Sequence, residues 1–404
     1  MREILPHPGL EHGPIYLDYN GTTPVDPRVV DAMLPYLTIH FGNPSNTHFY
    51  AHKPHAAIQT AREQVANLIG CAPAEIIFTA GGSESDALAI RGVALSRQER
   101  GKHLITQVTE HPAVLATCRQ LARLHGFRVT ELPVDASGRV RPADVEAAID
   151  KQTTLVSIMA ANNETGTLQA VAEIAAIAHR HGVLMHTDAA QAVGKIPTEV
   201  ATFGVDLLTI AGHKLYAPKG VGALYVRQGV QLEPVITGGG QEHGLRAGTE
   251  NVAAIVALGT ACELARQHLP TEQPRLAVLR DLLYQRLTEA LPGVVSLNGH
   301  PGERLPNTLN VSIEGVIGEE VLATIPQIAA ATGSACHAGE TEPSAVLLAM
   351  GIERARAKGA LRLTLGRWST EKEVEQAARL LIQAIRTLLS SASSEKREKD
   401  ELRR

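Results

Sequence analysis

The chain has 404 residues, of which 44% are hydrophobic and 20% are charged, a balance typical of globular proteins and not of disordered or fibrous ones. Its 38 basic and 42 acidic residues give a net charge of −4, so no surplus of positive charge favours nucleic acid as a partner. No apolar run approaches the ~20 residues that cross a bilayer, and the N-terminus lacks the apolar stretch of a signal peptide. We therefore expect a cytoplasmic protein of about two or three domains, with no membrane partner.

Short β-rich runs alternate with helical stretches from about residue 15, after an irregular arm over residues 1–14. A helix is predicted at 171–181, and strands are predicted at 76–79, 104–108, 155–159, 183–186, 207–210 and 222–226. Strands that alternate with helices indicate an α/β domain with a mostly parallel sheet.

The pattern changes near residue 260, where a helical stretch is followed by strand candidates at 309–313 and 360–365. Thr370 and Glu373 have the spacing of a capping box, and apolar residues then recur at helical spacing. We expect a large domain over residues 15–263 and a small α+β domain made of residues 1–14 and 264–390. The serine-rich, mixed-charge tail at 391–404 is expected to be disordered.

Three candidate sites follow predicted strands. Gly82 and Ser83 begin a helix directly after one strand, where free backbone N–H groups favour a phosphate. Asp188 ends another strand, on the edge of the sheet that faces the ligand crevice. Lys214 follows a third strand, and burial there can lower its pKa enough for Schiff-base chemistry. A lysine, an acid and an anion site together meet the needs of pyridoxal phosphate.

A metal site is the rival interpretation of the same region, because His179, His181, His186 and Asp188 could supply ligands. However, His179 and His181 are expected to end a helix, at the opposite end of the strand from Asp188. We therefore predict no metal site.

Cys336 differs from the other three cysteines in its surroundings. It lies among small and polar residues ahead of Pro343, which predicts an exposed loop. A thiol there favours a nucleophilic role, whereas Cys71, Cys118 and Cys262 are expected to be structural.

These motifs together resemble the cysteine desulfurases, pyridoxal-phosphate enzymes of the class-V aminotransferase superfamily. The matching segments run in order along nearly the whole chain: LDYNGTTP, FGNPSNTH, FTAGGSES, EHPAVL, NNETG, HTDAAQAVGK, GHKLYAPKGVGALY, GGGQEHGLRAGTEN, GSACHAG and ALRLTLGR. The resemblance implies a fold-type-I enzyme with a seven-stranded sheet.

The resemblance also implies how the cofactor is held. Lys214 matches the lysine that forms the Schiff base, and Asp188 matches the partner of the pyridine nitrogen. Gln191 and Asn163 match residues on the phenolic-oxygen side of the ring. The matched phosphate ligands are Gly82, Ser83 and His213.

Further matches concern the substrate and a second subunit. Thr249 matches a phosphate ligand that the other subunit of a homodimer donates. His111 matches the histidine that stacks on the ring and moves protons on the substrate sulfur. Asn20 and Arg362 match substrate-binding residues, with Arg362 holding the carboxylate. Cys336 matches the cysteine that takes sulfur from L-cysteine as a persulfide.

Some positions depart from the family pattern. Ala211 stands where many desulfurases have a phosphate-binding serine, and His337 follows the cysteine where threonine is usual. The Cys-His pair and segments such as ANNETG resemble the selenocysteine lyases. Two alternatives therefore remain beside cysteine desulfurase: a lyase that acts on L-selenocysteine, and a non-catalytic scaffold for sulfur transfer. The sulfur acceptor is left open between iron-sulfur cluster assembly, tRNA thiolation and cofactor sulfuration.

Overall fold

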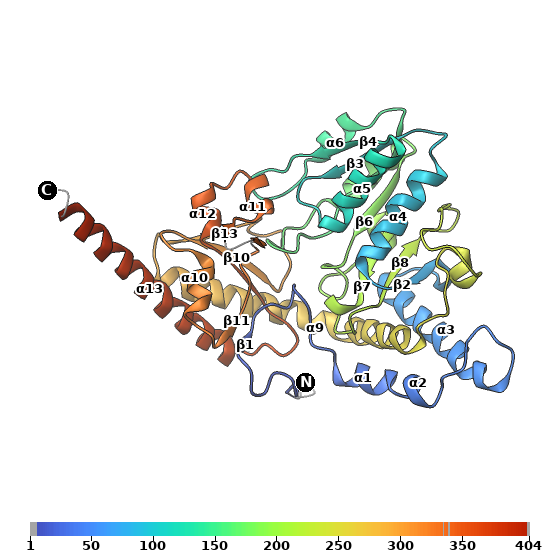
Figure 1. The fold of residues 1–404 in the computed structure, drawn as a ribbon, viewed down its shortest axis with the longest axis horizontal. Coiled ribbons are helices and arrows are strands. Elements are labelled where there is room, and N and C mark those ends of the chain that lie inside the picture. Colours follow the sequence, from blue (N-terminus) through green and yellow to red (C-terminus); the bar gives the residue numbers. More distant parts are fainter. Residues whose placement is uncertain (1–5, 334, 338–339, 402–404) are drawn as a thin grey trace.

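The computed structural model describes residues 6–333, 335–337 and 340–401, without the side chains of 335–337, 340–341 and 392–401. Figure 1 shows a larger body built on a twisted sheet and a smaller body, from which helix α13 (Glu371–Glu401) projects. Within the described part of the chain, no helix combines the length and apolar composition that crossing a membrane requires.

The larger body is built on a seven-stranded sheet. In spatial order its strands are β2 (Ile76–Thr79), β8 (Gly222–Val226), β7 (Leu207–Ala211), β6 (Leu184–Asp188), β5 (Thr153–Ser157), β3 (His103–Gln107) and β4 (Arg128–Leu132). The run from β7 to β4 is parallel, and β8 is antiparallel to both of its neighbours. Strands covered on both faces have nearly continuous apolar sequences, and six of these seven strands were predicted, all except the less buried edge strand β4. The predicted mostly parallel sheet is confirmed.

Helices cover both faces of this sheet. The helices of the larger body are α1 (Pro27–Met33), α2 (Pro35–Thr38), α3 (Phe49–Ile69), α4 (Gly82–Ser96), α5 (Pro112–His125), α6 (Pro142–Ala148), α7 (Val171–Arg180) and α8 (Val200–Phe203), with 3-10 turns η1 (Pro73–Glu75), η2 (Gly212–Lys214) and η3 (Gln241–Gly244). Local sequence sets their ends. In α5, for example, His111 is the N-cap, Pro112 opens the helix, and Gly126 closes it with φ of 72°.

The smaller body contains a three-stranded antiparallel sheet in the order β14 (Ala360–Thr364), β10 (Thr308–Ile313) and β9 (Val295–Leu297). Its helices are α10 (Gly318–Ala323), α11 (Ala345–Ala349), α12 (Arg354–Lys358) and α13. The predicted capping box is present, because the Thr370 N–H donates to Glu373 (2.8 Å) and the Glu373 N–H donates back to Thr370 Oγ1 (3.2 Å).

The long helix α9 (Val252–Ala290) joins the two bodies. Its first part, through Ala265, packs into the core of the larger sheet, whereas its leucines from Leu276 onward pack into the core of the smaller one. We propose that these two apolar cores define two domains. The boundary expected at 263/264 falls inside this continuous helix, which also contains Pro270 and Pro274.

The N-terminal segment lies with the smaller body. Strand β1 (Ile15–Tyr16) pairs with β11 (Ile328–Ala329), and Leu17 is part of the apolar core beneath them. We therefore propose that residues 15–17 belong to the smaller domain, whereas the large domain was expected to start at residue 15.

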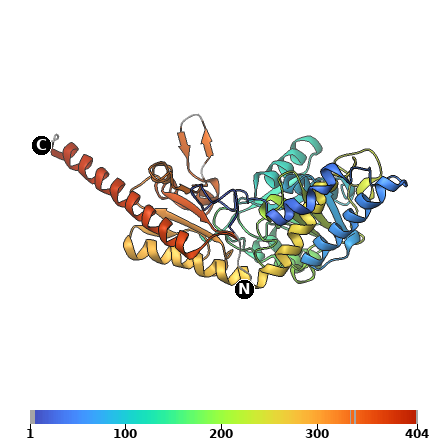
Figure 2. The same ribbon diagram turned by 90° about the horizontal axis from the view of Figure 1, so that it is seen from below.

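Two segments differ from their predicted structure. Helix α13 continues to Glu401, where the tail at 391–404 was expected to be disordered, and residues 402–404 lie outside the described chain. The tail has no glycine or proline and is rich in Glu and Lys, so its local propensity continues the helix. In place of the expected loop around Cys336, β12 (Ala335–His337) pairs antiparallel with β13 (Glu340–Glu342). Figure 2 shows this orange hairpin standing away from the smaller body.

Candidate active site

A cavity of about 230 Å³ lies at the carboxyl ends of β6 and β7, beside residues of the smaller body. Ten of the predicted site residues line it: Asn20, Gly82, Ser83, His111, Asn163, Asp188, Gln191, His213, Lys214 and Arg362. They come from segments spread over more than 340 positions of sequence, so the fold itself brings them together. Thr249 is not part of this lining, and the side chain of Cys336 lies outside the described part of the chain.

The start of α4 forms one wall of the cavity. Gly81 precedes the helix with φ of 150° and ψ of −178°, a conformation essentially restricted to glycine. The first N–H groups of a helix have no partner within it, and they favour an anion. Ala211 faces this helix start, and a Cβ on Gly82 would lie 3.2 Å from the Ala211 Cβ. Because both residues are small, the space between β7 and the helix start stays open to a ligand. The geometry fits a phosphate cradle.

His213 borders the same cradle as a neutral group. Its Nδ1 forms a hydrogen bond with Thr22 Oγ1 (3.1 Å), and burial lowers the pKa of His213 to about 4, helped by the nearby charge of Lys214. Near neutral pH the ring therefore contributes a dipole and no charge.

Asp188 is the last residue of β6 and is buried. Its Oδ1 accepts the N–H of Ala190 (2.9 Å). Burial raises the pKa of Asp188, while the Ala190 hydrogen bond and the charges of His111 and Lys214 oppose that rise. A buried carboxylate with this surrounding gains most from a cationic partner, and a protonated pyridine nitrogen would be one.

Lys214 lies on the 3-10 turn that follows β7. Its Nζ donates to the backbone oxygens of Asn20 (2.8 Å) and Gly21 (2.6 Å). Burial, and then the charge of Arg362, lower the pKa of Lys214 to about 8. A larger share of this amine is therefore neutral and nucleophilic at neutral pH than in an exposed lysine.

The amide side chains in the wall are fixed by hydrogen bonds. Gln191 Nε2 donates to the backbone oxygen of Asn20 (3.0 Å), and its Oε1 accepts from Lys195 Nζ (2.6 Å). Asn20 Nδ2 donates to Asn163 O (3.1 Å) and to Thr308 Oγ1 (2.8 Å). Both amide hydrogens of Asn20 are thus directed at protein acceptors, so its predicted contact with substrate would require one of these bonds to be exchanged.

His111 and Arg362 bring the polar groups expected to meet a substrate. Nδ1 of His111 accepts the Ala113 N–H (3.2 Å), which places the proton of the neutral ring on Nε2. Burial lowers the pKa of His111, and Lys214 adds to this effect.

Arg362 donates from Nη2 to Asp18 Oδ1 (2.8 Å), and its Nε is buried without a hydrogen-bond partner among the described residues. An entering carboxylate would satisfy that nitrogen.

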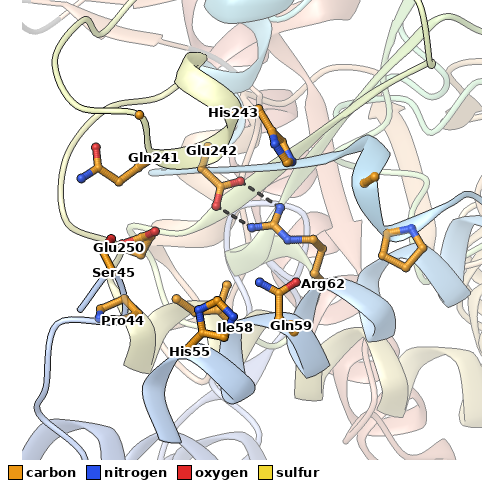
Figure 3. Close-up of a pocket in the computed structure, with 13 residues that line it drawn as sticks. Pro44, Ser45, His55, Ile58, Gln59, Arg62, Gln241, Glu242, His243 and Glu250 are labelled. Atoms are coloured by element: carbon orange, nitrogen blue, oxygen red, sulfur yellow. Dashed lines mark hydrogen bonds and ion pairs between the residues drawn. The ribbon is translucent and has the colours of Figure 1, made fainter. Parts of the chain in front are cut away.

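The two remaining predicted residues lie on separate segments. Cys336 belongs to β12, and its side chain is outside the described part of the chain. Thr249 is exposed on the glycine-rich loop after β8. Figure 3 shows that Glu242 of this loop forms an ion pair with Arg62 of α3. Arg62 Nη2 lies 2.6 Å from Glu242 Oε1, and Nη1 lies 2.9 Å from Oε2. The Phe78 N–H also donates to Glu242 (2.8 Å).

The residues considered for a metal site do not converge. His179 Nε2 lies 2.9 Å from Asp206 Oδ2, while His186 forms hydrogen bonds with Ser157 (2.8 Å) and Thr209 (3.1 Å) inside the sheet. Among the described residues, no group of three or more His, Cys, Asp or Glu side chains is arranged to hold a metal ion.

The cysteines predicted to be structural differ in exposure. Cys118 and Cys262 are buried and Cys71 is half-buried. Burial raises the pKa of Cys118 and of Cys71 to about 12, so both thiols are poor nucleophiles near neutral pH.

Sequence reasoning missed four ionisable residues around the cavity: Asp86, Glu110, Glu164 and Lys195. Burial raises the pKa of Glu110 to about 8, and its Oε1 accepts from Gln107 Nε2 (2.9 Å) and from the Met159 N–H (2.6 Å). Each missed residue stands within four positions of a predicted site residue. Closeness in sequence to a predicted site residue could therefore have identified these four residues. It does not, however, distinguish a buried side chain from an exposed one.

Comparison with known proteins agrees with this geometry. The family model described as "Aminotransferase class-V" matches residues 15–377. The mouse protein "Cysteine desulfurase" is 48% identical over 93% of this chain and 82% of its own length. "Cysteine desulfurase IscS" of Anaeromyxobacter dehalogenans (strain 2CP-C) is 48% identical over 93% of each chain.

Two solved structures extend the comparison to the fold. One titled "NIFS-LIKE PROTEIN" has a TM-score of 0.85 and 36% identity, over 93% of this chain and 99% of its own. Another, "SspA in complex with cysteine", has a TM-score of 0.78 and 40% identity, over 88% and 99%. The chain belongs to the class-V aminotransferase family and, within it, to the cysteine desulfurases.

Proposed function

We propose that this enzyme converts L-cysteine to L-alanine with bound pyridoxal 5′-phosphate and passes the sulfur to Cys336 as a persulfide. One observation carries the proposal: a single cavity holds a lysine of lowered pKa, a buried carboxylate and a helix start free to bind an anion. These are the attachments that the cofactor's aldehyde, ring nitrogen and phosphate require.

When bound, pyridoxal phosphate supplies an electron sink that stabilises negative charge at the substrate Cα. Asp188 is the residue that would hold the proton on the ring nitrogen. Lys214 would hold the cofactor before substrate arrives, and its neutral Nζ would then take and return the Cα proton. Gln191, held by Lys195 through its Oε1, keeps its Nε2 as the hydrogen-bond donor.

Arg362 and His111 would handle the substrate. The free Nε of Arg362 is suited to the cysteine carboxylate, with Asp18 keeping the guanidinium in place at 2.8 Å. His111 carries its proton on Nε2 in the neutral ring, because Nδ1 is engaged by Ala113. That proton is available to the sulfur side of the substrate.

The sulfur step balances without an external oxidant or reductant. A bond forms between Cys336 Sγ and the substrate sulfur, and the bond from that sulfur to Cβ breaks. The electron pair of the broken bond stays with the carbon skeleton, which takes up a proton and leaves as alanine. Cys336 is left as a persulfide, and a sulfur-acceptor protein would complete the cycle.

A second copy of the chain would complete the cofactor site. Thr249 is exposed and does not line the cavity of its own chain, which supports its predicted role toward a partner subunit. Exposed apolar side chains within residues 34–50 also support a homodimer: Leu34, Leu37, Ile39, Phe41, Phe49 and Tyr50 are 48–80% exposed. Phe41 and Phe49 each contact the ring of Tyr50, and exposed apolar side chains that lie together mark interaction sites.

A product assay tests the proposal. Purified holoenzyme receives L-cysteine or L-selenocysteine in parallel, and alanine, sulfide and selenide are measured. Alanine from cysteine with stoichiometric protein persulfide is expected. Alanine from selenocysteine alone would replace the proposal with the selenocysteine lyase alternative, and no alanine from either substrate would favour the scaffold.

A further inference from the structure

Glu164 lies in the turn after β5, next to the wall of the cavity. The Glu164 N–H donates to Asn162 Oδ1 (2.9 Å), and the Glu164 backbone oxygen accepts from Asn310 Nδ2 (3.1 Å). Its neighbour Asn163 lines the cavity and accepts a hydrogen bond from Asn20. The backbone at Glu164 is therefore fixed to both the cavity wall and strand β10 of the smaller sheet.

The Glu164 side chain contacts the far end of the hairpin that contains Cys336. Ser344 Oγ donates to Glu164 Oε2 (2.5 Å). Ser344 is 2% exposed and is the N-cap of α11, where its Oγ also accepts the Leu347 N–H (3.2 Å). Through this hydroxyl, the carboxylate is joined to the point where the chain leaves the hairpin and enters α11.

The same carboxylate oxygen lies beside the near end of the hairpin. Gly333 has φ of +77°, and a Cβ built there would lie 2.5 Å from Glu164 Oε2. No side chain larger than hydrogen fits in that space without displacing the carboxylate. One oxygen of Glu164 thus contacts both the residue before the hairpin and the residue after it.

Burying the Glu164 carboxylate at this position costs free energy, and an apolar side chain would fill the same space without that cost. Burial raises the pKa of Glu164, although the Ser344 hydrogen bond and the charge of Arg362 partly compensate. A buried carboxyl group costs stability unless it is hydrogen-bonded.

We propose that Glu164 is a positioning residue, which sets the base of the Cys336 hairpin relative to the cavity and so controls the sulfur-transfer step. The inference rests on the proposed role of Cys336. Steps that take place within the cavity before sulfur transfer should depend on Glu164 only weakly, through its charge interaction with Arg362, because its side-chain hydrogen bond is to Ser344, which does not line the cavity. Its effect should appear in the rate of persulfide formation.

The test compares Glu164→Ala with Glu164→Gln, which keeps an acceptor oxygen, and with Glu314→Ala, an exposed glutamate of the smaller body. Each holoenzyme is mixed with cysteine. The first spectral change of the cofactor and the persulfide on Cys336 are followed separately. We expect Glu164→Ala to slow persulfide formation by about tenfold, with the first spectral change within about twofold of wild type. Glu164→Gln should restore most of the rate, and Glu314→Ala should match wild type.

A second measurement does not need the reaction. Hydrogen exchange of the amides of residues 335–337 and 340–342 in the cofactor-free protein should be about tenfold faster in Glu164→Ala than in wild type. A Glu164→Ala enzyme with unchanged exchange and unchanged persulfide formation would overturn the proposal. Equal slowing of both kinetic phases would also overturn it, because that result indicates a general loss of structure. If the wild-type enzyme forms no persulfide on Cys336, the proposed function fails, while hydrogen exchange still decides whether Glu164 holds the hairpin.

A double-mutant cycle tests whether Glu164 acts on the hairpin through Ser344. Ser344→Ala and Glu164→Ala should each speed exchange of the hairpin amides. Both remove the bond between Ser344 and Glu164, and Ser344→Ala also removes the N-cap of α11, so the double variant should add little to the effect of Ser344→Ala. Additive effects would contradict an action of Glu164 through Ser344.

Discussion

The cavity and the Cys336 hairpin bring residues to the reaction in different ways. In the cavity, parallel strands end side by side, and ten predicted residues from distant segments meet in a space of about 230 Å³. The hairpin, β12 with β13, has only a two-stranded pairing of its own and stands away from the smaller body. The difference suggests a division of work, in which a rigid sheet holds cofactor and substrate while a separate element takes the product sulfur.

The largest expected effect comes from the centre of the cavity. Lys214→Ala should reduce alanine formation by at least ~1,000-fold, because the variant lacks both the cofactor attachment and the amine that moves the Cα proton. Borohydride reduction followed by peptide mapping should find no protein–cofactor bond. A reducible bond at another lysine, Lys195 for instance, would show that the attachment was assigned to the wrong side chain.

Cys336→Ala should separate the two regions. We expect alanine formation from cysteine to fall by about 100-fold, while the absorption spectrum of bound cofactor stays that of wild type. The loss with selenocysteine should be smaller, because selenolate is the better leaving group. Full activity of the variant on cysteine would point to direct elimination and remove the hairpin from the mechanism.

The loop with Thr249 offers a stability test. Glu242→Ala should lower the free energy of unfolding by ~3–5 kcal/mol, because it leaves the buried charge of Arg62 without its partner. Glu131→Ala, which breaks the largely exposed pair with Arg119, should change it by less than ~1 kcal/mol. Urea unfolding of both variants measures this difference, and equal values would contradict the structural importance of the buried pair.

The smallest effect concerns pH. The pKa of Lys214 is about 8 in the folded chain against an ordinary 10.5. Between these values the unfolded chain retains a proton that the folded chain has lost, so this lysine makes stability rise with pH. In cofactor-free protein, Lys214→Met should be more stable than wild type near pH 7.5, and that advantage should shrink toward pH 10. Thermal unfolding across this range tests it, and parallel curves would show that the Lys214 pKa is ordinary.

Gly82, Ser83, Asp188 and Lys214 could be predicted because strand ends are visible in sequence, whereas the other six predicted cavity residues were implied only by the resemblance to the cysteine desulfurases. The runs at 76–79 and 222–226 coincide with β2 and β8, and Asp188 and Lys214 follow apolar strands as expected. The hairpin and the tail could not be predicted in the same way, because neither has the apolar periodicity that marks a strand or a helix. The role of Glu164 depends on Ser344, 180 positions away, and only the folded structure brings such a pair together.

A single pulse of L-cysteine tests the central claim most directly. Holoenzyme is mixed with one equivalent of cysteine, trapped by alkylation, and analysed by peptide mass spectrometry alongside an alanine assay. Transfer from the cavity to the hairpin predicts one persulfide on Cys336 for each alanine formed. Alanine accompanied by a persulfide on Cys71, Cys118 or Cys262, or by free sulfide with Cys336 unmodified, would contradict it.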